Sequence, residues 1–159
     1  MAMVLSQVYR LACAGLFGAQ LFFAAVAAQV VFPREVAALP RSDARRQLAA
    51  DLVGSMLARL DAGTLAVSAL AVVCAVALGK WRAALLPLAA GLCALASAAV
   101  VTPRIHALRD AGQVALPKFG MLHALSSLLL LTEMLLLCVA ALRAPESARE
   151  TPPFLRNGD

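Results

Sequence analysis

Two histidines, His106 and His123, are the side chains of this sequence best suited to metal or proton chemistry. One follows an apolar run and the other opens the next run, so both are expected at a similar level on neighbouring helices. Imidazole nitrogen ligates metal ions and haem iron, and a haem- or metal-binding redox site is therefore one interpretation. The simpler interpretation is a pair of histidines hydrogen-bonded to loop carbonyls or water, because a metal site usually has about three or four ligands with supporting contacts.

Glu133 is an acid inside an otherwise apolar run, where insertion into a membrane costs at least ~2.5 kcal/mol. Glu133 lies as far before Arg143 as Gln20 lies after Arg10, which places both at the same depth, about 15 Å from these basic residues. We predict that Glu133 points into the bundle and lies within hydrogen-bond reach of Gln20, directly or through one water. The functional interpretation is an ion, proton or substrate site, and the structural one is a polar clamp worth about 0.6–2 kcal/mol.

Further polar residues gather in segment 102–118, next to the two histidines. Thr102 and Pro103 predict a helix start there. We expect Arg104 or Arg109 to pair with one of four acids: Asp43, Asp51, Asp61 and Asp110. Ser126 is spaced to share a helix face with His123 and Glu133. The candidate binding pocket therefore comprises Arg104, His106, Arg109, His123, Ser126, Glu133 and Gln20.

The composition excludes most classes of protein that use such residues in water. Of 159 residues, 62% are hydrophobic and 14% are charged, against roughly 45–50% and about 25% in soluble domains. A chain of this length cannot bury that excess in its own core. A soluble enzyme, a disordered chain and a disulfide scaffold are disfavoured, which leaves an integral membrane protein. The net charge is +5, and basic residues at the ends of apolar runs indicate lipid headgroups as partners, not nucleic acid.

The elements that must position these residues are four apolar spans, at about 11–32, 62–79, 83–101 and 119–142. Residues 47–60 have the pattern of an amphipathic helix. We therefore predict an all-α fold, a four-helix transmembrane bundle with an amphipathic helical extension before the second span. Residues 1–142 form the membrane domain, and residues 143–159 are expected to be a flexible polar tail.

Two local details remain open or weakly marked in the sequence. Ser42 is expected to cap the helix that follows it. Pro87 either removes the hydrogen bond to the Ala83 carbonyl, if the helix begins at Ala83, or sits in the first turn, if regular helix begins at Leu86.

Four spans place both termini on one side, called side A, which also holds turn 80–82. Side B holds loop 33–46, the amphipathic segment and segment 102–118. Six basic residues on side A against eight on side B do not assign an orientation by the positive-inside rule. The four cysteines lie in apolar runs without CxxC spacing, so we interpret them as small apolar residues and not as a copper site.

Three segments carry a family resemblance: Gly18–Phe32 (GAQLFFAAVAAQVVF), Thr102–Asp110 (TPRIHALRD) and Phe119–Ser127 (FGMLHALSS). Their order and spacing resemble the transmembrane protein 205-like family of small four-span membrane proteins, a domain of unknown function, over roughly residues 8–142. The resemblance implies a four-helix membrane fold and no particular activity. It also implies a role for Pro103, Arg104, Arg109, His123 and Ser126, whereas the role of Glu133 rests on the physical argument alone.

The leading hypothesis is a membrane-embedded binding or accessory protein with a transport-related role and a polar pocket on side B. It is not expected to be an enzyme, and no cofactor is predicted. The alternatives are a haem- or metal-binding redox protein that uses His106 and His123, and a structural subunit of a larger membrane complex. A homo-oligomer or other membrane subunits would then be its partners.

Overall fold

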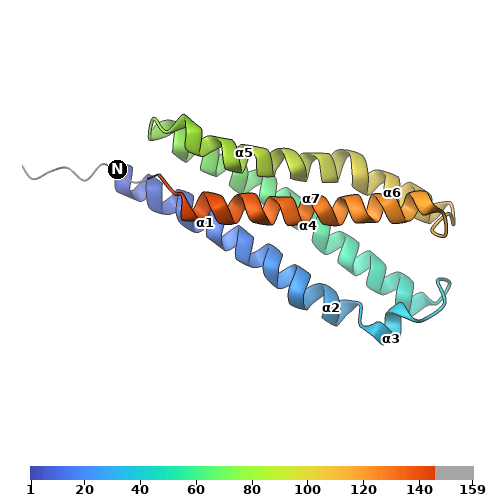
Figure 1. Ribbon diagram of the computed structural model, residues 1–159. Helices are drawn as coiled ribbons and strands as arrows, with labels where there is room; N and C mark the ends of the chain where they lie inside the picture. The colour runs from blue at the N-terminus through green and yellow to red at the C-terminus, as the bar shows by residue number, and fades with distance from the viewer. Residues whose placement is uncertain (146–159) are drawn as a thin grey trace, which may run out of the picture.

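The computed structural model describes residues 1–145, and within them the chain is helical with no strand. Four helical stretches are long and apolar enough to cross a membrane: Ala2–Val31, Ala44–Ala77, Trp81–Asp110 and Pro117–Leu142. The expected all-α transmembrane bundle is therefore confirmed. Figure 1 shows the four stretches packed along one another, converging at the end that holds the N-terminus.

The first stretch consists of α1 (Ala2–Phe22), the π-helical turn η1 (Phe23–Ala27) and α2 (Ala28–Val31). The short helix α3 (Arg34–Ala37) follows in the loop. The helix α1 begins well before Leu11, where the sequence predicted the first span, because nothing in residues 2–10 interrupts helical hydrogen bonding.

The helix α4 (Ala44–Ala77) joins the expected amphipathic extension and the second span into one unbroken helix of 34 residues. At ~1.5 Å per residue it is about 51 Å long, which exceeds the hydrocarbon core of about 30 Å. Its N-terminal part therefore reaches beyond the apolar layer when α4 crosses the membrane. Leu48 and Leu52 on this part are exposed, and Ala49 is buried.

The cap of α4 differs from the expected one. Asp43 and not Ser42 is the N-cap, and its Oδ1 accepts a 2.9 Å hydrogen bond from the Arg45 backbone N–H. The Arg45 side chain also bonds this carboxylate, and this hydrogen bond holds the pKa of Asp43 below its usual range. A carboxylate interacts more favourably than a hydroxyl with the positive end of the helix dipole, which explains why Asp43 and not Ser42 is the N-cap of α4.

The third stretch consists of α5 (Trp81–Ala96), the π-helical turn η2 (Ser97–Val101) and α6 (Thr102–Asp110), and α7 (Pro117–Leu142) forms the fourth. The helical path is continuous from η2 into α6, so Thr102 does not cap a new helix as expected. Val101 is the residue before α6, and its backbone is helical.

Because α5 begins at Trp81, Pro87 lies inside the helix and not in its first turn. A proline has no N–H, so the carbonyl of Ala83 loses its helical partner. The Tyr9 hydroxyl of α1 donates a 2.8 Å hydrogen bond to this same carbonyl. The open question about Pro87 is thereby decided, and the freed carbonyl is satisfied by another helix.

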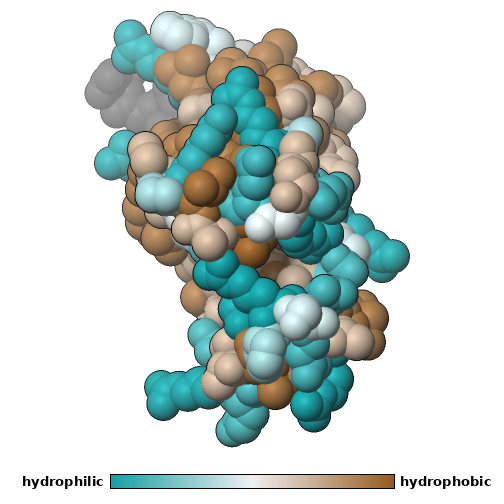
Figure 2. Space-filling model, turned by 90° about the vertical axis from the view of Figure 1, so that its right-hand side faces the viewer, coloured by the Kyte–Doolittle hydropathy of each residue, from teal (hydrophilic) through white to brown (hydrophobic). Residues whose placement is uncertain are grey.

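The bundle is filled by small side chains and surfaced by large apolar ones. Its apolar core includes Cys13, Ala71, Cys74, Ala90 and Leu137, and small residues let helix backbones approach closely. Large exposed side chains such as Phe22, Val73 and Leu135 cover the outside. This arrangement, with apolar residues outside, suits a lipid surrounding. Figure 2 looks at the end formed by α3, α6 and their loops, where mainly hydrophilic side chains gather.

Candidate functional site

The buried polar side chains of residues 1–145 gather between the four long helical stretches. Gln20 comes from α1, Ser97 from η2 and Glu133 from α7, and α4 contributes Asp61, Thr64 and Ser68. Each of these six side chains is at most 3% exposed. We call them the polar cluster. Because apolar helix surface surrounds it, every hydrogen bond it makes has to come from within the bundle.

Gln20 is the centre of the polar cluster. Its Nε2 donates one 3.0 Å hydrogen bond to Thr64 Oγ1 and another of 3.0 Å to Glu133 Oε2. The predicted contact between Gln20 and Glu133 is therefore present and direct. The Thr64 hydroxyl in turn donates a 2.9 Å hydrogen bond to the Leu60 carbonyl, one turn earlier on α4.

Asp61 corrects the sequence analysis, which placed it among the acids at the rim of side B. It is 2% exposed, and its Oδ2 accepts a 2.9 Å hydrogen bond from Ser97 Oγ. Asp61, Thr64 and Ser68 are spaced by three and four residues, so they share one face of α4. This spacing was present in the sequence and would have located the face. The partner Ser97 opens a π-helical turn, a feature often found at functional sites.

Three side-chain atoms of the polar cluster have no hydrogen-bond partner: Gln20 Oε1, Ser68 Oγ and Glu133 Oε1. Buried polar atoms without partners are uncommon and cost about 1–3 kcal/mol each. All three belong to one cluster, and two of them belong to side chains that already bond each other. The polar cluster can therefore take up an additional hydrogen-bonding or charged group.

The two acids of the polar cluster have no buried basic partner. The buried polar and charged side chains of residues 1–145 are the six cluster members and Ser126, and none carries a positive charge. An ionised carboxylate in such surroundings is costly unless a positive charge compensates it. The chemistry of Asp61 and Glu133 thus calls for a proton or a cation.

On side B the expected ion pair is confirmed. Arg109 Nη2 lies 2.8 Å from Asp51 Oδ1, which ties α6 to the N-terminal part of α4. Arg104 is exposed. A surface pair of this kind contributes about 0–1 kcal/mol to stability, so its main effect is on where α6 sits.

The two histidines lie on side B, outside the polar cluster. His106 is exposed, and its Nε2 approaches Gly54 of α4. His123 is also exposed and stacks on the Phe119 ring, with centroids 6.4 Å apart. The expected shared face is therefore split, because Ser126 is buried with Glu133 while His123 is not. Over residues 1–145, no group of three or more potential ligands could hold a metal ion.

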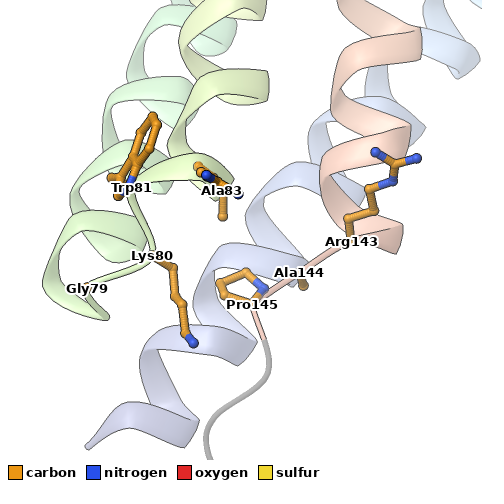
Figure 3. Close-up of a pocket in the computed structure, with 8 residues that line it drawn as sticks. Gly79, Lys80, Trp81, Ala83, Arg143, Ala144 and Pro145 are labelled. Carbon is orange, nitrogen blue, oxygen red and sulfur yellow. The ribbon is translucent and has the colours of Figure 1, made fainter.

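A surface hollow lies on side A, opposite the pocket expected on side B. It is bounded by residues 79–83, which include the turn after α4 and the first residues of α5, and by residues 143–145 after α7. In Figure 3 the side chain of Lys80 reaches toward α1, whereas the side chain of Arg143 points away from the hollow. Arg82 places its guanidinium 5.5 Å from the centre of the Trp81 ring. The side chains of Lys80 and Arg143 therefore do not converge on a common point.

The fold and the polar cluster together define a class: a multi-pass integral membrane protein with four apolar helices around buried polar side chains. Residues 11–114 match the model of a family described as a domain of unknown function, DUF4149. This match covers more than half of the chain, which therefore belongs to the DUF4149 family. Comparisons with curated proteins and with solved structures gave no match. The matched segment includes every member of the polar cluster except Glu133.

Proposed function

We propose that this protein is a membrane-embedded binding protein with a transport-related role, whose polar cluster holds a small positively charged ligand. The carrying observation is the burial of two carboxyl groups, Asp61 and Glu133, on different helices and without a buried basic side chain in the described chain. Acids inside membrane bundles commonly mark ion and proton pathways. The unpartnered oxygens of Gln20 and Glu133 supply acceptors for such a ligand.

The proposal moves the binding site from the side-B loops to the interior of the bundle. Glu133 and Gln20 of the expected pocket belong to it, joined by Asp61, Thr64, Ser68 and Ser97. Ser126 lies seven residues before Glu133 on α7, about two turns further toward side B, and is buried, so it lies on the route from the side-B end. Arg104, His106, Arg109 and His123 line that end and are proposed to influence entry from side B.

The experiment is an ion-flux measurement in vesicles that contain the purified protein and an internal pH-sensitive or Na⁺-sensitive dye. Wild-type protein is expected to speed the response to an imposed H⁺ or Na⁺ gradient. Glu133→Gln and Asp61→Asn are expected to reduce the response to that of protein-free vesicles. Glu35→Gln is the matched control, because Glu35 is an exposed acid on α3, and it should behave as wild type. Equal responses from wild type and Glu133→Gln for both ions would overturn the proposal.

The proposed partner is the lipid bilayer, and binding to nucleic acid is not proposed. The proposal requires no haem or metal cofactor. A Soret band in the absorption spectrum of the purified protein would contradict this and indicate haem. A second protein that co-purifies in fixed stoichiometry would indicate a subunit of a larger complex. A narrower relationship to the transmembrane protein 205-like family is also proposed, on the three segments that resemble it, and adds no activity.

A further inference from the structure

The hydrogen atoms of the polar cluster can be counted against its acceptors. Gln20 has two side-chain N–H groups, and both are used, one on Thr64 Oγ1 and one on Glu133 Oε2. The Thr64 hydroxyl hydrogen is used on the Leu60 carbonyl, and that of Ser97 on Asp61. Three atoms are left without a partner: the acceptors Gln20 Oε1 and Glu133 Oε1, and Ser68 Oγ, whose hydroxyl hydrogen bonds neither of these two oxygens.

Both unsatisfied acceptors belong to a pair of side chains that are already hydrogen-bonded. An amide and a carboxylic acid can form two hydrogen bonds with each other, since each group then has one donor and one acceptor. The first of these bonds is present, from Gln20 Nε2 to Glu133 Oε2 at 3.0 Å. One hydrogen on Glu133 Oε1 would supply the second bond and satisfy both atoms.

We infer that Glu133 binds a proton on Oε1 and shares it with Gln20 Oε1, so that the two side chains form an acid–amide pair between α7 and α1. The inference deepens the proposed function, on which it rests, by naming the proton as the positively charged ligand. Water is the source of the proton and takes it back on release. No bond other than that to hydrogen changes.

A proton fits this position better than a metal ion. Hard cations such as Ca²⁺ take about six to eight oxygen ligands, whereas the free oxygens of the pair number two. A proton also leaves the pair neutral, which suits the apolar surroundings of Glu133. Among residues 1–145, the titratable groups that interact by charge with Glu133 are Asp61 on α4 and Cys93 on α5, and both are acidic. The facing residue of α1, Gln20, does not titrate.

Release of the proton would break the shared hydrogen bond and leave a carboxylate facing the Gln20 carbonyl oxygen. Two acceptors in contact repel, so the deprotonated state favours separation of the two side chains. Gln20 also donates a hydrogen bond to Thr64 of α4. A movement of the Gln20 side chain would therefore change this contact with α4 as well. Proton binding and release at Glu133 thus couples α7 to both α1 and α4.

Infrared spectroscopy of the protein in lipid tests the inference, because a protonated carboxyl group has a carbonyl stretch distinct from that of a carboxylate and shifts it in D₂O. The wild type is expected to show this band at neutral pH. Glu133→Gln should lose it, and Asp61→Asn and the control Glu35→Gln should retain it. A wild type without the band, or a band that survives in Glu133→Gln and disappears in Asp61→Asn, would overturn the inference.

The two proposals fail in distinguishable ways. A Glu133-dependent band without any ion flux would uphold the acid–amide pair and reject the transport role. Flux that depends on Glu133 without the band would uphold the proposed function and reject the proton as its resident ligand. Glu133→Gln keeps the fold for these measurements, since two amides can also form two mutual hydrogen bonds.

Discussion

Gln20 joins more elements than any other residue of the polar cluster, because one amide nitrogen bonds side chains of α4 and α7 from its place on α1. The contribution of such a residue to the free energy of unfolding depends on the buried polar groups that lose their hydrogen-bond partner when it is replaced. A buried carboxyl group that loses its donor pays the full cost of desolvation, about 1–3 kcal/mol and more if charged.

Gln20→Leu is expected to lower the free energy of unfolding by about 1–3 kcal/mol, because Glu133 Oε2 and Thr64 Oγ1 both lose a donor. Glu133→Gln should change it by less than about 1 kcal/mol, because the mutual hydrogen bonds persist. Chemical unfolding in detergent micelles measures both. Gln29→Leu, at an exposed glutamine of α2, is the matched control and should cause little change. Equal effects at positions 20 and 29 would show that the polar cluster does not stabilise the bundle.

At the scale of elements, α5 depends on its neighbours for two of its features. Pro87 frees the Ala83 carbonyl, and Tyr9 of α1 supplies the missing hydrogen bond. Gly91, one turn later, meets α4 so closely that an added Cβ would lie 3.1 Å from Ser68 Cβ. The helix α5 therefore depends on the Tyr9 hydroxyl of α1 for a hydrogen bond, and on the absence of a side chain at Gly91 for its close contact with α4.

Tyr9→Phe should destabilise the protein by about 1–3 kcal/mol, since the Ala83 carbonyl is then left without a donor in the bundle. In a Pro87→Ala background the restored N–H can bond that carbonyl, so Tyr9→Phe should cost much less there. A double-mutant cycle on unfolding free energies measures the difference. Additive effects of the two substitutions would contradict the link between Tyr9 and Pro87.

Gly91→Ala should destabilise by about 1–3 kcal/mol, because the new methyl group pushes α4 and α5 apart at a close contact. Gly18→Ala is the control: an added Cβ there meets nothing within 4 Å, and alanine is the better helix former by about 1 kcal/mol. Adding Ser68→Gly to Gly91→Ala removes the atom that the methyl group meets and should restore part of the loss. Thermal unfolding in detergent compares the variants, and similar midpoints for Gly91→Ala and Gly18→Ala would refute the close contact.

At the scale of the whole molecule, four membrane-crossing stretches bring the start and the described end of the chain to the same end of the bundle. Ser6 Oγ donates a 2.5 Å hydrogen bond to the Pro145 carbonyl, and Ala144 and Pro145 are buried. Residues 144 and 145 of the expected tail therefore pack against the bundle, and residues 146–159 lie outside the described part of the chain. Figure 1 shows the C-terminal end of α7 near the N-terminal part of α1.

Both termini are predicted to face the same compartment, because an even number of crossings returns the chain to its starting side. Reporter fusions at residue 2 and at residue 159 should give the same result in an intact-cell assay. A reporter placed in loop 33–46, between the first two stretches, is the internal control and should give the opposite result. Opposite compartments for the two termini would exclude four crossings.

The sequence by itself determined the helical membrane class and the pairing of Gln20 with Glu133. Apolar runs of about 18 residues or more span a membrane as helices, because each run then satisfies its own backbone hydrogen bonds. Equal distances from Arg10 and Arg143 set both side chains at one depth. Only the tertiary structure decided the burial of Asp61, its bond to Ser97 and the link between Tyr9 and Ala83. These three contacts depend on which face of one helix packs against which face of another. The spacing of residues along a helix shows which side chains share a face, but the partner of that face is set only when the helices pack.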